Sequence, residues 1–243
     1  MENTVHVFED SKSTAEAVAQ RIFELAVNKS NKNDFFNMAV SGGSTPKQLF
    51  EVLAEEPYAS SIPWQTIRLF WVDERCVEPT DSESNFGMTY DSLLHKHYIP
   101  VENIFRMKGE EIPADEIEEY SEILKNELPE RNGFPVFDLI LLGMGDDGHT
   151  ASIFPNNLTL LKSEKSVEVA THPISRQKRI TLTGKTINNA DKVFFLITGS
   201  NKAAILSSII KKTPESLKYP ASYVGNYLNE VEFFIDKSAS LKI

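Results

Sequence analysis

The segment FDLILLGMGDDGHTAS, residues 137–152, joins the most apolar run of the chain to a glycine-rich turn. A continuous apolar run of this length, closed by glycine, is typical of a strand that is buried on both faces of a parallel sheet. Gly143, Gly145 and Gly148 follow it with the spacing G-x-G-x-x-G, which is also the spacing of a dinucleotide-binding turn. The turn therefore either binds a nucleotide or uses its glycines for another purpose.

The segments on either side alternate between strand and helix patterns. Strands are predicted at 5–8, 35–40, 67–72, 104–107, 137–142, 166–171, 178–182, 193–198 and 232–235. Helices are predicted at 11–28, 45–53, 84–96, 113–128 and 199–210, and residues 73–83 are predicted to form a polar loop. This alternation indicates a mainly parallel sheet covered on both faces, with ligands beyond the carboxyl ends of its strands. Because no linker-like stretch or internal repeat divides the chain, we expect residues 1–243 to form one α/β domain.

The composition argues against several classes of protein. The chain has 243 residues and a formal net charge of −10, so it lacks the basic face that nucleic acids and anionic membranes require. Its single cysteine, Cys76, excludes an internal disulfide and a multi-cysteine metal site, and it fits a reducing compartment. The N-terminus has no signal-peptide pattern, and no apolar run reaches the ~18 residues of a membrane span. We expect a cytoplasmic protein with no bound metal and no nucleic-acid or membrane partner.

Three turns that follow predicted strands carry residues suited to anion binding. Residues 41–46, Ser-Gly-Gly-Ser-Thr-Pro, precede a helix and can direct backbone N–H groups at a phosphate, although a tight capped turn explains them equally well. Arg75, in Asp73-Glu74-Arg75, can hold phosphate or carboxylate oxygens or form a surface ion pair. Lys202 lies in the first turn of a predicted helix, where a bound anion would offset the unfavourable helix dipole. The alternative for Lys202 is an exposed surface lysine.

The 143–152 turn is poorly suited to a dinucleotide. Asp146 and Asp147 inside it would repel a pyrophosphate, and Pro155 would end the following helix early. The glycines fit better as a sharp bend that presents Asp147 and His149 to a cleft. A histidine beside a carboxylate is the ordinary equipment of a general base, so the sequence predicts a catalytic loop here.

These turns belong to a larger set of motifs that occur in a fixed order along the chain: SGGSTP (41–46), DER (73–75), ESN (83–85), GMGDDGHTASIFP (143–155), RITLT (179–183), GSNKA (199–203) and YPAS (219–222). Together they resemble the 6-phosphogluconolactonase family over most of the chain. In the related glucosamine-6-phosphate deaminases, the matching loop carries a glutamate where this chain has Phe154. Phe86, Ile153 and Glu78 depart from the lactonase pattern, but none of them replaces a charged site residue.

The resemblance implies a fold and a reaction. The fold is a modified Rossmann-like, three-layer α/β/α sandwich with a mainly parallel sheet. The reaction is hydrolysis of 6-phospho-D-glucono-1,5-lactone to 6-phospho-D-gluconate in the oxidative pentose phosphate pathway, with a small sugar-phosphate lactone as substrate and no cofactor. A deaminase or isomerase of the glucosamine-6-phosphate type and a non-catalytic sugar-phosphate sensor remain as alternatives.

The resemblance also implies roles for individual residues. His149 would act as the base on water, and Asp147 would orient either His149 or the water. Asp73 would position Arg75 or a substrate hydroxyl, and both residues are candidates for the catalytic set. Arg75 and backbone N–H groups both qualify as donors to the oxyanion that forms when water attacks a lactone. The expected contacts to substrate and phosphate come from Gly42, Gly43, Ser44, Thr45, Arg75, Arg179 and Lys202.

Overall fold

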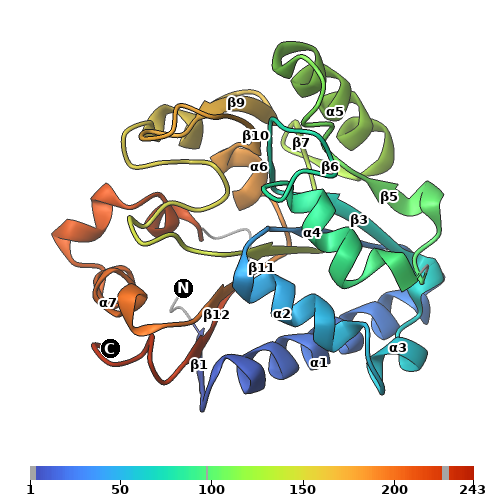
Figure 1. Cartoon of the computed structure of the whole chain (residues 1–243), viewed down its shortest axis with the longest axis horizontal. Helices are drawn as coiled ribbons and strands as arrows, with labels where there is room; N and C mark the ends of the chain where they lie inside the picture. The colour runs from blue at the N-terminus through green and yellow to red at the C-terminus, as the bar shows by residue number, and fades with distance from the viewer. Residues whose placement is uncertain (1–3, 97, 226–229) are drawn as a thin grey trace.

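The computed structural model describes residues 4–96, 98–225 and 230–243. Within these ranges, seven strands form one sheet in the order β1–β12–β11–β8–β2–β3–β5 (Figure 1). Every neighbouring pair in this sheet runs parallel, which confirms the predicted fold class. The strands are β1 (Thr4–Phe8), β12 (Glu230–Asp236), β11 (Lys192–Ile197), β8 (Leu139–Leu142), β2 (Phe36–Val40), β3 (Ile67–Trp71) and β5 (Ile104–Phe105).

The strand at the centre of the sheet, β8, is the apolar run Leu139–Leu142. It pairs with β11 on one side and with β2 on the other, and all four of its residues are buried. A strand that is covered on both faces needs apolar side chains in both directions, which explains its uninterrupted apolar sequence. Because the sheet is parallel, the loops that follow β11, β8, β2 and β3 open at the same edge.

Helices cover one face of the sheet, and a mixed layer covers the other (Figure 1). In that view α1 (Ser11–Ser30) and α2 (Ser44–Leu53) lie below the sheet, with α3 (Tyr58–Ser61) and α4 (Asn85–Ser92) packed beside them. Above the sheet lie α5 (Pro113–Glu127), α6 (Gly184–Asn188) and the antiparallel sheet β4–β10–β9. This small sheet comprises β4 (Asp73–Arg75), β10 (Lys178–Leu182) and β9 (Val167–Thr171).

The remaining regular elements are short. A hairpin of β6 (Glu130–Arg131) and β7 (Phe134–Pro135) follows α5, and α7 (Ala203–Ile210) follows β11. Single turns of 3-10 helix occur at 64–66, 94–96, 101–103, 158–161, 200–202, 214–218 and 220–223. Within the described ranges, no helix combines the length and the apolar character needed to cross a lipid bilayer.

The structure corrects several local predictions. Residues 73–75, predicted to lie in a polar loop, form strand β4 because they pair with Arg179–Thr181 of β10. The helix predicted at 84–96 ends at Ser92, since Leu93 leaves the helical conformation with φ −139°. The helix predicted at 199–210 begins with a 3-10 turn at Ser200–Lys202, and the α-helix starts only at Ala203.

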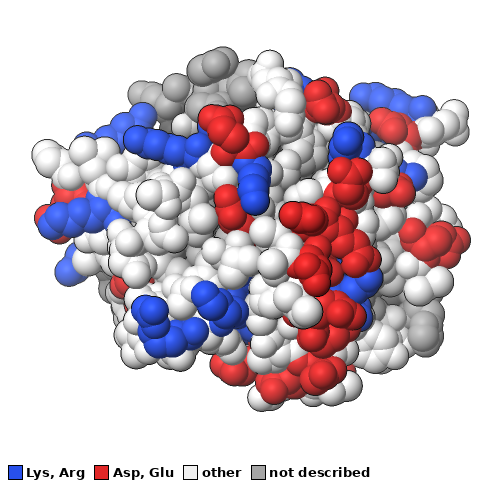
Figure 2. All heavy atoms as spheres, turned by 90° about the horizontal axis from the view of Figure 1, so that it is seen from above, with Lys and Arg blue, Asp and Glu red and all other residues white. Residues whose placement is uncertain are grey.

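The surface above α5 is strongly acidic. Figure 2 shows a band of Asp and Glu side chains on this face, and α5 contributes the exposed residues Asp115, Glu118, Glu119 and Glu122. A negatively charged ligand is repelled by such a surface. Any anion that this chain binds therefore depends on a local concentration of cations.

Candidate active site

A cleft of about 410 Å³ opens where the loops after β11, β8, β2 and β3 meet. This is the edge at which parallel sheets bind ligands. Asp147 does not line the cleft but contacts His149, which does. The structure therefore brings the predicted turns together, and the predicted residues that line the cleft are Gly42, Gly43, Ser44, Thr45, Asp73, Arg75, His149, Arg179 and Lys202.

His149 is held by Asp147. Its Nδ1 lies 2.6 Å from Asp147 Oδ1, and its backbone N–H donates to the same oxygen at 3.1 Å. Gly145 leaves the space that this pair occupies, because a Cβ at that position would lie 2.2 Å from His149 Nδ1 and 2.9 Å from Asp147 Oδ1. Gly148 reverses the chain with φ +81°, and its N–H donates to the carbonyl of Gly145 at 3.0 Å.

These contacts account for Gly145 and Gly148 without a nucleotide. In the described part of the chain, the next helical element after β8 is the 3-10 turn Leu158–Leu161. A Rossmann turn seats its pyrophosphate on the N-terminus of the helix that begins at its third glycine. The turn has no such helix, and Gly145 instead makes room for the His149–Asp147 pair.

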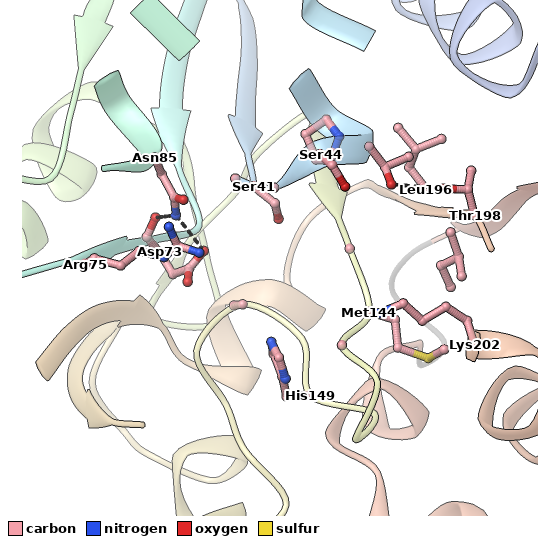
Figure 3. Close-up of a pocket in the computed structure, with 18 of the residues that line it drawn as sticks. Ser41, Ser44, Asp73, Arg75, Asn85, Met144, His149, Leu196, Thr198 and Lys202 are labelled. Atoms are coloured by element: carbon pink, nitrogen blue, oxygen red, sulfur yellow. Dashed lines mark hydrogen bonds between the residues drawn. The ribbon is translucent and has the colours of Figure 1, made fainter. Parts of the chain in front are cut away.

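The charge state of Asp147 sets the proton position on His149. Burial acts to raise the pKa of Asp147, but the hydrogen bond and charge of His149 outweigh it and lower that pKa to about 2. Asp147 is therefore a carboxylate at neutral pH and accepts the Nδ1 proton, which leaves the lone pair of Nε2 free. Figure 3 shows the His149 side chain pointing into the cleft, between Arg75 on one side and Lys202 on the other.

The loop after β2 is hydrogen-bonded to β8 and to the segment that follows β11. Ser41 Oγ donates to the carbonyl of Leu141 at 2.9 Å, and Thr45 Oγ1 lies 3.0 Å from Thr198 Oγ1. Gly43 has φ +111°, a conformation that other L-residues rarely adopt, and no side chain caps α2 at this residue. The first N–H groups of α2 are therefore available at the cleft, as in the anion sites formed by helix N-termini.

Asp73 supports the wall of the cleft. It is only 5% exposed, and its Oδ2 accepts a hydrogen bond from Ser152 Oγ at 2.6 Å. Asn85 Nδ2 donates to the carbonyl of Asp73 at 2.8 Å and more weakly to Oδ1 at 3.4 Å. Both carboxylate oxygens thus have protein partners, and no hydrogen bond or ion pair joins Asp73 to Arg75 among the described residues.

Glu74 fastens β4 to the start of α4. It is 2% exposed and accepts the backbone N–H groups of Arg75, Asn85 and Phe86, each at 2.7 Å, together with Ser84 Oγ at 3.1 Å. Burial raises the pKa of Glu74, while the three backbone hydrogen bonds oppose that rise. The carboxylate satisfies N–H groups at a helix N-terminus that would otherwise lack partners.

Arg75 and Arg179 form what we call the arginine wall, since they face each other across β4 and β10. Arg75 Nη1 donates to the carbonyl of Glu83, and Arg179 lies 5.7 Å from the ring centre of Phe154. The Nε atoms of both arginines are buried without a partner, and neither residue forms an ion pair with a described residue. Burial lowers the pKa of Arg179, as does the adjacent Arg75, whereas Asp73 opposes the change. Like charges directly across two strands repel each other, so this wall is suited to an anion.

Asn85 is a cleft residue that the sequence did not predict, although it lies in the quoted ESN motif. Besides holding Asp73, it packs on Gly42, where an added Cβ would lie 1.7 Å from Asn85 Oδ1. It therefore links β4 to the loop after β2. The requirement for glycine at position 42 was the available signal, but its cause is a neighbour 43 residues away in the sequence.

The described residues hold no group of three or more His, Cys, Asp or Glu side chains placed to bind a metal ion.

Comparisons with known proteins place the chain among enzymes of sugar phosphates. The family model described as "Glucosamine-6-phosphate isomerases/6-phosphogluconolactonase" matches residues 9–232. The 6-phosphogluconolactonase of Haemophilus influenzae is 42% identical over 226 residues, covering 93% of this chain and 95% of that protein. The 6-phosphogluconolactonase of Treponema pallidum is 42% identical over 204 residues, covering 84% and 83%. The solved 6-phosphogluconolactonase of Trypanosoma brucei is 27% identical, with a TM-score of 0.86 and coverage of 100% and 99%.

Proposed function

The chain belongs to the family of glucosamine-6-phosphate isomerases and 6-phosphogluconolactonases, and from that premise we propose that it hydrolyses 6-phospho-D-glucono-1,5-lactone to 6-phospho-D-gluconate. The observation that carries this proposal is the 2.6 Å contact between His149 Nδ1 and Asp147 Oδ1, which leaves Nε2 as a base beside a cationic cleft. A lactonase needs such a base together with a site for the phosphate of its substrate.

His149 Nε2 takes a proton from a water molecule as the water oxygen attacks C1 of the lactone. The carboxylate of Asp147 stabilises the imidazolium that results. The carbonyl oxygen becomes an oxyanion, for which Arg75 and backbone N–H groups are the candidate donors. When the tetrahedral intermediate collapses, the bond from C1 to the ring oxygen breaks. His149 returns its proton to that oxygen, which yields a hydroxyl and a carboxylic acid that ionises in water.

The phosphate rests on the backbone of the loop after β2, from Gly42 to Thr45, and on side chains from both sides of the cleft. Lys202 approaches from the loop after β11, opposite the arginine wall. Asp73 is assigned a supporting role, because Ser152 and Asn85 already engage both of its carboxylate oxygens. The substrate is thereby oriented with its carbonyl carbon near His149.

A lactonase is favoured over a deaminase by Phe154. This side chain is fully buried, with its ring 4.9 Å from that of His149 and 5.7 Å from the guanidinium of Arg179. A deaminase of the related type would need a carboxylate at this place to help open and isomerise an amino sugar. The apolar ring offers no proton-transfer group there.

The test follows hydrolysis of freshly prepared lactone against its spontaneous opening, in the parent and in His149→Gln. Loss of the base is expected to lower turnover by about 10²- to 10⁴-fold while binding of 6-phosphogluconate is retained. The loss should shrink at high pH, where hydroxide replaces the activated water. Asp147→Asn should also lower turnover, and the two losses should not add, because the pair acts as one unit.

His172→Gln is the matched control. Its ring packs on Phe154 at 5.1 Å, as that of His149 does at 4.9 Å, but His172 does not line the cleft. Near-normal turnover in His149→Gln would place the base elsewhere. A parent protein that binds 6-phosphogluconate without accelerating lactone opening would be a sensor, and ammonia release from glucosamine 6-phosphate would indicate a deaminase.

A further inference from the structure

Lys202 is not a free cation in the cleft, because it is paired with a carboxylate. Its Nζ forms a close ion pair with Asp146 Oδ1, and Asn201 Nδ2 donates to the same oxygen at 2.9 Å. The Lys202 side chain is 18% exposed, whereas that of Asp146 is 68% exposed. Among the described residues, Asp146 is the carboxylate with which Lys202 pairs.

The position of Lys202 explains why it needs a counter-ion. It precedes α7 directly, so its charge lies at the positive end of a helix dipole. Asp146 offsets that conflict, and its hydrogen bond and ion pair with Lys202 keep the pKa of Asp146 below its usual value. The carboxylate of Asp146 is therefore charged at neutral pH.

A phosphate that binds Lys202 draws on the same ammonium charge that Asp146 now neutralises. Asp146 is mostly solvent-exposed, and it lies in the turn next to Asp147 rather than in a helix or strand. Its carboxylate can move into water without breaking a buried contact. Lys202, by contrast, is largely enclosed by the cleft, so the exchange occurs on the Asp146 side of the pair.

We propose that Asp146 is an internal competitor for the phosphate subsite, a counter-ion that neutralises Lys202 in the unliganded protein and is displaced when phosphate binds. This inference rests on the proposed phosphate contact of Lys202. Since lactone and 6-phosphogluconate carry the same phosphate, the competition weakens binding of both. Asp146 thus speeds release of the product and limits its inhibition.

The experiment measures dissociation constants for 6-phosphogluconate and for inorganic phosphate by calorimetry, in a double-mutant cycle of Asp146→Asn and Lys202→Met. Asparagine keeps an oxygen for the hydrogen bond from Asn201 and removes only the charge. We expect Asp146→Asn to bind both ligands about two- to fivefold more tightly, the range that a partly exposed ion pair allows. In the Lys202→Met background, the same substitution should give a clearly smaller gain.

Glu164→Gln is the matched control for overall charge. Glu164 is exposed, and it pairs with Lys185 outside the residues that line the cleft. The inference is overturned if Asp146→Asn binds no more tightly than this control, or if the gain is as large without Lys202. If Lys202→Met alone leaves binding unchanged, the phosphate contact of the proposed function fails as well, and the two failures are thereby distinguished.

Discussion

On one side of the cleft, Arg75 and Arg179 lie side by side without a carboxylate partner among the described residues, and on the other side Lys202 is paired with Asp146. Both sides belong to an acidic chain with a formal net charge of −10. The arginine wall keeps its full positive charge and the repulsion that comes with it. The lysine side has no net charge, because Asp146 neutralises Lys202. We propose that the first region attracts phosphate permanently, whereas the second exchanges partners.

The largest effect on the arginine wall is expected from a substitution at Glu74, the residue next to Arg75 in β4. Glu74→Gln would turn an N–H₂ group toward the N-terminus of α4, where the carboxylate now accepts the N–H of Phe86. A buried donor left without an acceptor costs about 1–3 kcal/mol, and the lost charge weakens the remaining hydrogen bonds. We expect about 3 kcal/mol less free energy of unfolding in denaturant titrations. The remaining folded protein should show a raised KM, because Arg75 is less firmly placed.

Glu116→Gln is the control for this variant, since it removes another buried glutamate charge away from the cleft. Glu116 Oε1 accepts the N–H of Lys108 at 2.8 Å, while Oε2 has no partner. Burial raises the pKa of Glu116 to about 6. The raised pKa means that ionised Glu116 disfavours folding, so parent stability is lost as the pH rises from 4.5 through about 6. The free energy of unfolding of Glu116→Gln, relative to that of the parent, should therefore be higher at pH 7.5 than at pH 5. A loss in Glu116→Gln as large as that in Glu74→Gln would show that the cap on α4 is not the cause.

The next largest effect should follow from removing one charge of the arginine wall. Arg75→Ala should weaken binding of 6-phosphogluconate about ten- to a hundredfold, because a charged hydrogen bond is worth roughly 1.5–3 kcal/mol. Arg75→Lys should recover part of the loss by keeping the charge without the bidentate geometry. Calorimetry against Arg21→Ala, which removes an arginine from the surface of α1, checks the specificity of the effect. Unchanged affinity in Arg75→Ala would remove this wall from the phosphate site.

The smallest expected effect has the opposite sign. Arg179→Met keeps an apolar side chain against Phe154 and removes the repulsion from Arg75. Like charges across a strand pair cost about 0.2–1 kcal/mol, so the unliganded variant should be more stable by that amount. Chemical denaturation at low and high salt measures the gain, which should shrink as salt screens the charges. A less stable variant at low salt would mean that Asp73 already offsets the repulsion between Arg75 and Arg179.

Much of the fold follows from local patterns. The central strand β8 was predicted from the uninterrupted apolar run alone, because burial on both faces leaves that signature in the sequence. Strand β4 was missed for the converse reason, since Asp73-Glu74-Arg75 has the polarity of a loop. Its backbone pairs with β10, and the side chains of Asp73 and Glu74 accept hydrogen bonds from Ser152 and from the start of α4. Ser152 and β10 lie far away in the sequence. Long-range hydrogen bonding of this kind leaves no local pattern.

In the candidate site, too, local features could be predicted and long-range contacts could not. The segments that bear His149, Arg75 and Lys202 could be located, because each follows a recognisable strand. The partners of those residues within the site could not. Pairing of Lys202 with Asp146 depends on how two loops meet, and packing of Asn85 on Gly42 depends on where α4 begins. Such contacts arise only in the assembled sheet.

The central place of β8 has a consequence for how activity arises during folding. Its neighbours β2 and β11 come from residues 36–40 and 192–197, so the cleft needs segments about 150 positions apart to meet. Closing loops of that length is costly, and parallel pairings of high contact order form slowly. No local fragment holds the assembled cleft, so the ability to turn over substrate emerges late, together with the completed sheet.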